Sequence, residues 1–171
     1  ISIYAVSKIS NELMARSYNH LYGIKMVGLR FFTVYGPWGR PDMAMYIFAN
    51  KILNKEPVPV FNNGDMYRDF TYIDDIIEGI KASLSLDFNC EIFNLGNNNS
   101  ESIMYLLSLI ENTLNKKAII DFQKIQPGDV KKTVANIEYA EKLLNYRPKT
   151  KLQDGVSAFL DWYLKYHKVK I

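Results

Sequence analysis

The sequence predicts an α/β fold. The prediction rests on the order of the helical and apolar segments, on the position of one glycine and on the composition. Residues at helical spacing run over 4–22, Gly23 follows, and a short apolar segment of strand length covers 26–32. Helix, glycine and buried strand in this order are typical of a parallel α/β layer. The 171 residues are 48% hydrophobic and 23% charged, which suits one sizeable core and not a disordered chain.

The helix predicted over 4–22 ends clearly, because Gly23 stands where a C-terminal cap belongs. Glu12 is spaced to pair with Arg16 one turn later. Residues three or four positions apart give the helical period: Leu13, Met14, Ser17 and Leu21.

Loop, helix and extended segments are predicted to follow. The stretch 36–42 contains two Pro and two Gly and is a predicted loop, and a helix is expected over 43–54. Two prolines favour an extended segment over 57–61. The turn signal at 62–65 separates it from a strand over 68–73, which suggests a β-hairpin.

Helices and strands also alternate in the second half of the chain. Asp74 or Asp75 is expected to cap a helix that reaches about Leu86, and Ser100 to cap a helix through about Leu114. Strands are predicted over 91–95 and 117–122, a turn over 126–129, a short helix from Asn136 to Asn145 and a last helix over 152–167. The aromatic residues of that last helix, Trp162, Tyr163 and Tyr166, are interpreted as a packing face without a site.

Charge and residue usage exclude several classes of function. The formal charge of +3 is spread along the chain, so neither nucleic acid nor an acidic membrane surface is an expected partner. A single cysteine, Cys90, excludes an internal disulfide, and His20 and His167 lie far apart, so no metal site is expected. Because there is also no apolar run of bilayer length and no signal-peptide pattern, we predict a cytoplasmic protein.

Tyr4 and Lys8 are the first candidates for catalysis. Four positions apart on a helix, they share one face. An ammonium group close to a tyrosine favours the phenolate, which makes the tyrosine a usable base near neutrality. Tyrosine and lysine are common residues, however, and a solvated helix face explains the same spacing.

Six motifs occur in an order and spacing that resemble the NAD-dependent epimerase/dehydratase branch of the extended short-chain dehydrogenase/reductase family. They are YAVSK at 4–8, NEL at 11–13, LRFFTVYGPWGRPDMA at 29–44, RDFTYIDD at 68–75, FNLG at 93–96 and QPGDV at 126–130. Within this family, GPWGRPDMA and QPGDV are most similar to the UDP-glucuronate 4-epimerases, including members from capsule polysaccharide biosynthesis.

The resemblance implies a catalytic centre with NAD as its tightly bound cofactor. Tyr4 would be the base and acid at sugar carbon 4, and Lys8 would bind the nicotinamide ribose and supply a positive field. The segment from Phe32 to Val34 would pass beside the nicotinamide and the sugar. The function implied is a nucleotide-sugar 4-epimerase of the UDP-glucuronate/UDP-galacturonate type.

The resemblance also implies a binding site for a UDP-sugar substrate. Thr33 and Arg40 would recognise the sugar carboxylate, since arginine suits planar, two-pronged binding, although Arg40 could instead pair with Asp42. The remaining substrate residues would be Arg68 at the diphosphate, Asp129 near a ribose or in its turn, and Val60 and Phe61 at the uracil. For Arg68 a surface pair with Asp69 is the alternative, and Gln126 departs from the arginine that several family members carry at that turn.

The same resemblance implies a Rossmann-type parallel sheet domain, of which this chain has the C-terminal part, and a smaller mixed α/β substrate domain. We expect 1–35 and 69–96 in the NAD-binding domain, and 36–68 and 97–171 in the substrate domain. The chain opens on apolar residues, and the Gly-rich βαβ fingerprint for pyrophosphate is absent. We therefore expect the carboxy-terminal half of an epimerase, inactive by itself.

Two alternatives remain open from the sequence, together with one expectation about assembly. One alternative is a nucleotide-sugar dehydratase or decarboxylase of the same family. The other is a non-catalytic nucleotide-sugar-binding module, in which Arg68 would matter and Tyr4 would not. The resemblance further implies a homodimer formed through the helix Tyr4–Tyr22.

Overall fold

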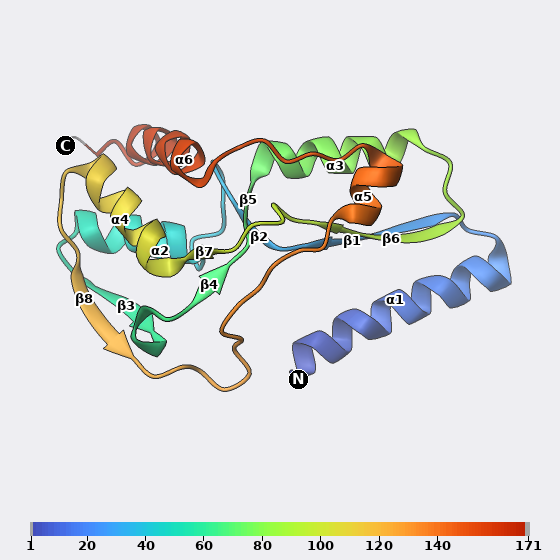
Figure 1. The fold of residues 1–171 in the computed structure, drawn as a ribbon, viewed down its shortest axis with the longest axis horizontal. Helices are drawn as coiled ribbons and strands as arrows, with labels where there is room; N and C mark the ends of the chain where they lie inside the picture. Colours follow the sequence, from blue (N-terminus) through green and yellow to red (C-terminus); the bar gives the residue numbers. More distant parts are fainter. Residues whose placement is uncertain (1, 170–171) are drawn as a thin grey trace.

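The computed structural model describes residues 2–169 and shows an α/β fold (Figure 1). Its α-helices are α1 (Ile3–Tyr22), α2 (Ala44–Leu53), α3 (Ile73–Ser85), α4 (Ile103–Leu114), α5 (Glu138–Leu144) and α6 (Leu152–Tyr166). Its strands are β1 (Met26–Phe31), β2 (Thr33–Tyr35), β3 (Pro57–Phe61), β4 (Tyr67–Arg68), β5 (Phe70–Tyr72), β6 (Cys90–Leu95), β7 (Glu101–Ser102) and β8 (Ile119–Gln123). A 3₁₀ turn, η1, covers Asn62–Gly64.

The parallel layer predicted from the first helix and strand is present. β1 and β6 pair in parallel, from Met26 opposite Cys90 to Phe31 opposite Leu95. α1 lies along one side of this pair and α3 along the other (Figure 1). Gly23 ends α1 in the left-handed conformation, with φ 65°, as its capping position predicts.

The chain changes sheet partner where β1 passes into β2. The amide of Phe32 donates to the carbonyl oxygen of Leu95 in β6, at 3.3 Å. The next amide, that of Thr33, donates to the carbonyl oxygen of Asp69, at 3.0 Å, and β2 then pairs with β5 in parallel. The β1–β6 and β2–β5 pairs therefore meet at the peptide between Phe32 and Thr33. Thr33 lies just after the carboxyl end of β1.

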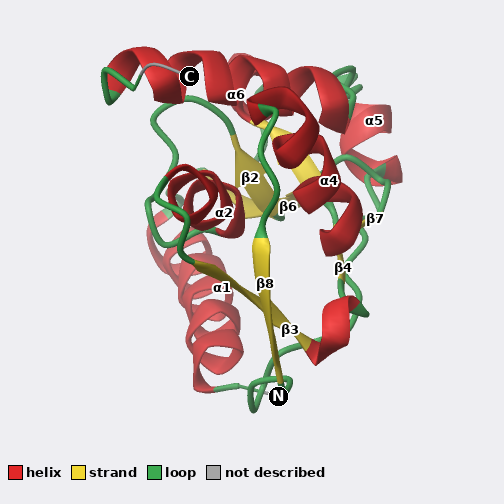
Figure 2. Cartoon of the chain, turned by 90° about the vertical axis from the view of Figure 1, so that its left-hand side faces the viewer, coloured by secondary structure: helices red, strands yellow, loops and turns green. Residues whose placement is uncertain are grey.

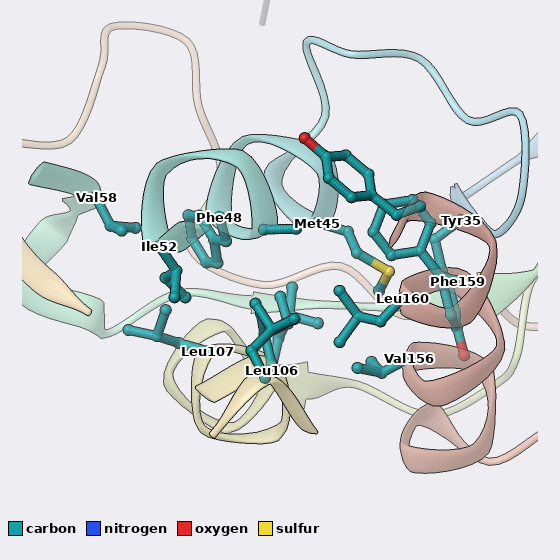
Figure 3. Packing of buried hydrophobic residues seen from close by; sticks show 14 of the residues in the cluster. Tyr35, Met45, Phe48, Ile52, Val58, Leu106, Leu107, Val156, Phe159 and Leu160 are labelled. Atoms are coloured by element: carbon teal, nitrogen blue, oxygen red, sulfur yellow. The ribbon is translucent and has the colours of Figure 1, made fainter. Parts of the chain in front are cut away.

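The main core lies where α2, α4 and α6 meet (Figure 3). Met45, Phe48 and Ile52 point inward from α2 and meet Leu106 and Leu107 of α4. Val156, Phe159 and Leu160 complete this core from α6, and Tyr35 packs at its edge. Each helix contributes one apolar face, and Val58 and Val60 of β3 are buried in the same core.

A second hydrophobic cluster belongs to the β1–β6 layer. Phe93 and Leu95 of β6 pack with Ile76 of α3, and α5 contributes Ala140 and Leu144. Helix α5 therefore packs with the segments assigned by sequence to the NAD-binding domain, although it falls within 97–171. The division into two domains stays a prediction.

The β-hairpin predicted from 57–61 and 68–73 is wrong. β3 pairs in parallel with β8, a neighbour that Figure 2 shows beside it, and the second segment is divided into β4 and β5. Asp69 lies at the division, where its buried carboxylate accepts hydrogen bonds from the amides of Asn97 and Ala135. β4 and β5 consequently continue into different sheets, β4 with β7 and β5 with β2.

Two predicted helix caps are displaced. Ser102, and not Ser100, caps α4, since its hydroxyl accepts from the amides of Met104 and Tyr105. Neither Asp74 nor Asp75 caps α3, which begins one residue earlier. Asp75 instead accepts from the amides of Lys149 and Thr150, so it connects α3 to the segment before α6.

α1 is the least buried helix in the described part of the chain. Its helical face of Ala5, Glu12, Ala15 and Asn19 is half-buried, and its other side chains are exposed. Leu13 and Leu21 are 59% and 67% exposed, so the apolar side of α1 does not contact the rest of this chain. Within residues 2–169, the helices fall short of the length and apolar character that crossing a membrane requires.

Candidate functional site

A cavity of about 270 Å³ lies between α2, the carboxyl end of β3 and the first residues of β2 and β5. Its polar lining consists of Thr33, Asp42, Arg68 and Asp129. Its apolar lining comes mainly from α2, β3 and the residues around them: Met43, Ala44, Ile47, Phe48, Pro59, Phe61, Met66, Phe70 and Ile103. An apolar cavity with a few converging polar groups is the usual form of a small-molecule site.

Arg68 and Asp129 form the charged end of this cavity. The guanidinium of Arg68 donates to Asp129 Oδ1 at 2.7 Å and to the carbonyl oxygen of Tyr67 at 2.9 Å. The Arg68 side chain is only 15% exposed, and its guanidinium also donates to the carbonyl oxygen of Lys131 at 3.4 Å. The surface pair of Arg68 with Asp69 considered from the sequence is wrong, since Asp69 points into the protein and Asp129 is the partner.

The three residues from Phe32 to Val34 point in alternate directions. Thr33 lines the cavity, whereas Phe32 and Val34 pack against the cluster around Phe93 and Leu95. The alternation follows from extended backbone, in which successive side chains point to opposite faces. A cofactor contact by Phe32 and Val34 stays a prediction. Because their side chains pack inward, a ligand would contact the backbone of these two residues.

The predicted uracil residues also divide between cavity and core. Phe61 lines the cavity, at the end of β3. Val60 is fully buried and packs in the main core. Of this pair, only Phe61 is placed to contact a base, and the role of Val60 stays a prediction.

Arg40 lies on the loop between β2 and α2, and it pairs with Asp42. Arg40 Nε donates to Asp42 Oδ1 at 3.0 Å, and the second guanidinium nitrogen donates to the other carboxylate oxygen. The hydrogen bonds and the charge of Asp42 raise the pKa of Arg40, and the phenol of Tyr4 adds a smaller electrostatic effect in the same direction.

Tyr4 and Lys8 form the predicted pair on the first turns of α1. Lys8 Nζ lies 5.1 Å from the centre of the Tyr4 ring, and the Tyr4 side chain is 71% exposed. Both residues line a groove of about 460 Å³ between α1 and β1. The groove continues past Glu12 to Phe31, at the carboxyl end of β1.

Glu12 and Arg30 fix α1 to β1 within this groove. The two groups are bonded at two points, at 2.6 and 2.7 Å, so Glu12 pairs with Arg30 and not with Arg16 as its spacing suggested. At the other end of the helix, the side-chain amide of Asn19 donates to Asn89. These contacts leave the turn with Tyr4 and Lys8 accessible.

The turn at 126–129 lies close to the first residues of α1. The amide of Asp129 donates to the carbonyl oxygen of Gln126 at 3.1 Å, which confirms the predicted turn. A Cβ placed on Gly128 would lie 3.8 Å from the Cβ of Ser2. The start of α1 therefore lies beside the turn that contains Asp129, the partner of Arg68.

Asp69 is the site-forming residue that sequence reasoning missed. It is fully buried and accepts hydrogen bonds from the Thr71 hydroxyl and from the amides of Asn97 and Ala135. Its own backbone accepts from the amide of Thr33 and donates to the hydroxyl of Thr133. An acidic residue between a cavity arginine and a strand was the available signal, but the three segments it joins are far apart in sequence.

Comparison with protein families identifies a match over more than half of the chain. The NAD dependent epimerase/dehydratase family model matches residues 1–96. Protein CapI of Staphylococcus aureus is 44% identical over 98% of this chain, which corresponds to 56% of that protein. UDP-glucuronate 4-epimerase 2 of Arabidopsis thaliana is 42% identical over 98% of this chain and 42% of its own length.

Solved structures agree with the fold. UDP-glucuronic acid 4-epimerase from Bacillus cereus, solved with UDP-glucuronic acid and NAD, superposes with a TM-score of 0.90 at 39% identity. The alignment covers 95% of this chain and 52% of that one. UDP-glucose 4-epimerase from Thermotoga maritima superposes with a TM-score of 0.91 at 27% identity and covers 98% of this chain.

These similarities confirm the family resemblance, the fold class and the family's cofactor, NAD. The chain spans about half the length of the relatives it matches.

Proposed function

Because this chain belongs to the NAD dependent epimerase/dehydratase family, we propose that it supplies the base and the substrate site of a UDP-glucuronate 4-epimerase. The observation that carries the proposal is the proximity of three groups. Tyr4 lines the groove beside α1, and Arg68 lines the cavity together with Asp42, which pairs with Arg40. Gly128, next to Asp129 in the cavity lining, lies beside Ser2, so the start of α1 with the proposed base is close to the cavity with the proposed diphosphate-binding group.

The groove beside α1 fits NAD by the chemistry of its lining. Lys8 offers an ammonium group to ribose hydroxyls, and the carboxyl end of β1 opens onto the same groove, where ligands bind in parallel α/β folds. When bound, NAD supplies a reversible two-electron oxidation at sugar carbon 4. The described residues contribute the acid–base part of the reaction.

Tyr4 is proposed as the group that moves the proton. Its phenolate oxygen accepts the proton of the hydroxyl at carbon 4 as that carbon is oxidised, and returns it when the ketone is reduced from the other face. The ammonium of Lys8, 5.1 Å from the ring centre, stabilises the phenolate. The proton and the electrons are both returned, so the products differ from the substrate only in the configuration at carbon 4.

Arg40 and Thr33 are proposed to select the carboxylate of the sugar. In the structure Asp42 occupies the guanidinium of Arg40, and both side chains are largely exposed. A sugar carboxylate can replace Asp42 as a two-pronged acceptor without burying an unpaired charge. Thr33, which points into the cavity, adds a hydroxyl donor.

Arg68, Phe61 and Asp129 are proposed to bind the nucleotide. Arg68 is preordered by Asp129 and by the carbonyl oxygen of Tyr67, so it loses little freedom when it meets a diphosphate. Phe61 offers an aromatic surface to the uracil. Gln126 adds no charge, so Arg68 is the principal cation at the diphosphate.

The deciding experiment is Tyr4→Phe in the complete gene product, with UDP-glucuronate turnover and UDP binding both measured. We expect turnover to fall by at least about 100-fold, since general base catalysis contributes on that order, and UDP affinity to be unchanged. Tyr18→Phe is the matched control, because Tyr18 is also exposed on α1. Retained turnover in Tyr4→Phe would contradict the assignment of Tyr4 as the base, whereas a wild-type protein that binds UDP without turnover would favour a binding module. Residues 1–171 by themselves are expected to show no turnover.

A further inference from the structure

Three aromatic side chains join the Arg40 loop to the last helix. Trp38, at the tip of the loop, lies 5.4 Å from Trp162 and 5.1 Å from Tyr166, measured between ring centres. Trp162 and Tyr166 stack on each other at 5.2 Å. We call Trp38, Trp162 and Tyr166 the aromatic clamp, and it contains both tryptophans of the chain.

The backbone at Trp38 has a conformation that its sequence does not favour. Trp38 has a φ of 63°, in the left-handed region that bulky residues avoid. Its side chain is 74% exposed, so burial does not compensate for this conformation. In the described part of the chain, the aromatic contacts of its ring are those with Trp162 and Tyr166.

The clamp is attached to a rigid part of the protein. Phe159, Leu160 and Tyr163 anchor α6 in the main core, so the adjacent Trp162 and Tyr166 present a fixed surface. At the other end of the loop, Gly36 has a φ of 144°, and a Cβ there would lie 2.5 Å from Ile73 Cγ2. The loop is thus fixed at its start by Gly36 and at its tip by Trp38.

The position of Trp38 determines that of Arg40, two residues later. The amide of Gly39 donates to the carbonyl oxygen of Gly36 at 3.2 Å, and the amide of Met43 donates to that of Arg40 at 3.2 Å. With Pro37 and Pro41 also restricting the backbone, few conformations connect these turns. A clamped Trp38 therefore limits where the guanidinium of Arg40 can lie.

We propose that the aromatic clamp positions Arg40 and thereby sets the preference for a nucleotide sugar that carries a carboxylate. This inference rests on the proposed function. Trp38, Trp162 and Tyr166 are positioning residues, because they act through Arg40 and contact no substrate. Without the clamp, the ligand itself would have to order Arg40. This loss of conformational entropy would lower the affinity only of ligands that bind Arg40.

The experiment compares the binding of UDP-glucuronate and of UDP to the complete gene product by calorimetry. Trp162→Leu removes the partner of Trp38 from α6, and Trp38→Gly removes the ring while permitting the left-handed backbone. In both variants we expect affinity for UDP-glucuronate to fall about tenfold, as for a weakened hydrogen bond to a charged group, and affinity for UDP to change less than about twofold. Tyr105→Leu, which removes a partly exposed aromatic ring from α4, is the control and should change neither.

Hydrogen exchange at the amides of Gly39 and Met43 in the protein without ligand gives an independent measurement. Faster exchange in Trp162→Leu supports positioning of the loop by the clamp. Equal loss of affinity for both ligands, or an unchanged preference, overturns the inference. If the wild-type protein binds UDP-glucuronate and UDP equally, the proposed function is contradicted instead. The clamp is then tested by hydrogen exchange alone, and an unchanged exchange rate in Trp162→Leu would overturn the inference as well.

Discussion

At the scale of single residues, Asp69 connects the two parts of the site. Its carboxylate accepts from three donors, one in a strand and two in loops, and its backbone binds Thr33. In Asp69→Asn, one of the two acceptor oxygens becomes an NH₂ group that faces backbone N–H donors. We expect the free energy of unfolding to fall by about 2–4 kcal/mol, measured by urea denaturation.

The control for Asp69 is Asp87→Asn, which removes a charge from an exposed pair with Lys25. That variant should change the free energy of unfolding by less than about 1 kcal/mol. Equal stability of the Asp69 and Asp87 variants would show that the buried hydrogen bonds of Asp69 contribute little.

Gly155 and Tyr35 make a second prediction at this scale. Alanine usually stabilises a helix relative to glycine, but a Cβ on Gly155 of α6 would lie 2.2 Å from Tyr35 Oη. Among the described residues that buried hydroxyl has no hydrogen-bond partner. We therefore expect Gly155→Ala to lower the free energy of unfolding by about 1–3 kcal/mol, and Tyr35→Phe to leave it unchanged or raise it slightly.

The double variant distinguishes this explanation from a general weakening of α6. Removal of the Tyr35 hydroxyl should recover part of the stability lost in Gly155→Ala, because the ring carbons still lie 2.7 Å from the added methyl group. Thermal unfolding of the four proteins measures the coupling. Strictly additive effects would contradict a direct clash.

The sequence predicted site residues but not the contacts between them. Thr33, Phe61, Arg68 and Asp129 were named from the family resemblance, and all four line one cavity, while their roles stay predictions. The pairing of Arg68 with Asp129 could not be read from spacing, since 61 positions separate them and Asp69 is adjacent. The position of Asp69 next to Arg68 in the sequence does not show that the carboxylate of Asp69 points into the protein.

At the scale of elements, the packing of α1 against β1 depends on the ion pair between Glu12 and Arg30. The hydrogen bonds and charge of Arg30 lower the pKa of Glu12. The pair therefore contributes stability above the ordinary pKa of glutamate, about 4.3, and loses it as the pH falls through the lower pKa of the folded protein.

Glu12→Gln tests this contribution. At neutral pH we expect the free energy of unfolding to be about 0.5–1 kcal/mol lower than in the wild type, and the difference to disappear as Glu12 is protonated in acid. Lys25→Met, which breaks another exposed pair, serves as the control for general charge effects. A difference that persists in acid would mean that the pair does not act through the ionised carboxylate.

The elements themselves follow from local signals, whereas their pairing does not. Gly23, the prolines of β3 and the turn at 62–65 marked helix end, strand and turn correctly. The hairpin failed because β3 finds its partner in β8, and a hydrophobic strand does not specify which of several strands lies beside it. The predicted cap of α3 was wrong for a related reason, because Asp75 makes a tertiary contact with the segment before α6.

At the scale of the whole molecule, the apolar side of α1 gives a prediction about assembly. Leu13, Met14, Tyr18 and Leu21 are each more than half exposed, and we propose that a second copy of the protein covers them. Leu13→Glu should then convert a dimer to a monomer in analytical ultracentrifugation. Leu84→Glu, an equally apolar exposed position on α3, should not.

A monomeric wild-type protein would contradict the dimer directly. A dimer unaffected by Leu13→Glu would place the contact elsewhere.

The parallel strand pairs have a consequence for synthesis of the chain on the ribosome. β3 is complete at Phe61, but its partner β8 ends only at Gln123. At about 5–20 residues per second, β3 waits roughly 3–12 s for that partner. β1 waits similarly for β6. The nascent chain thus exposes unpaired apolar strands for seconds, so chaperone binding should be greatest while residues between β3 and β8 are being added.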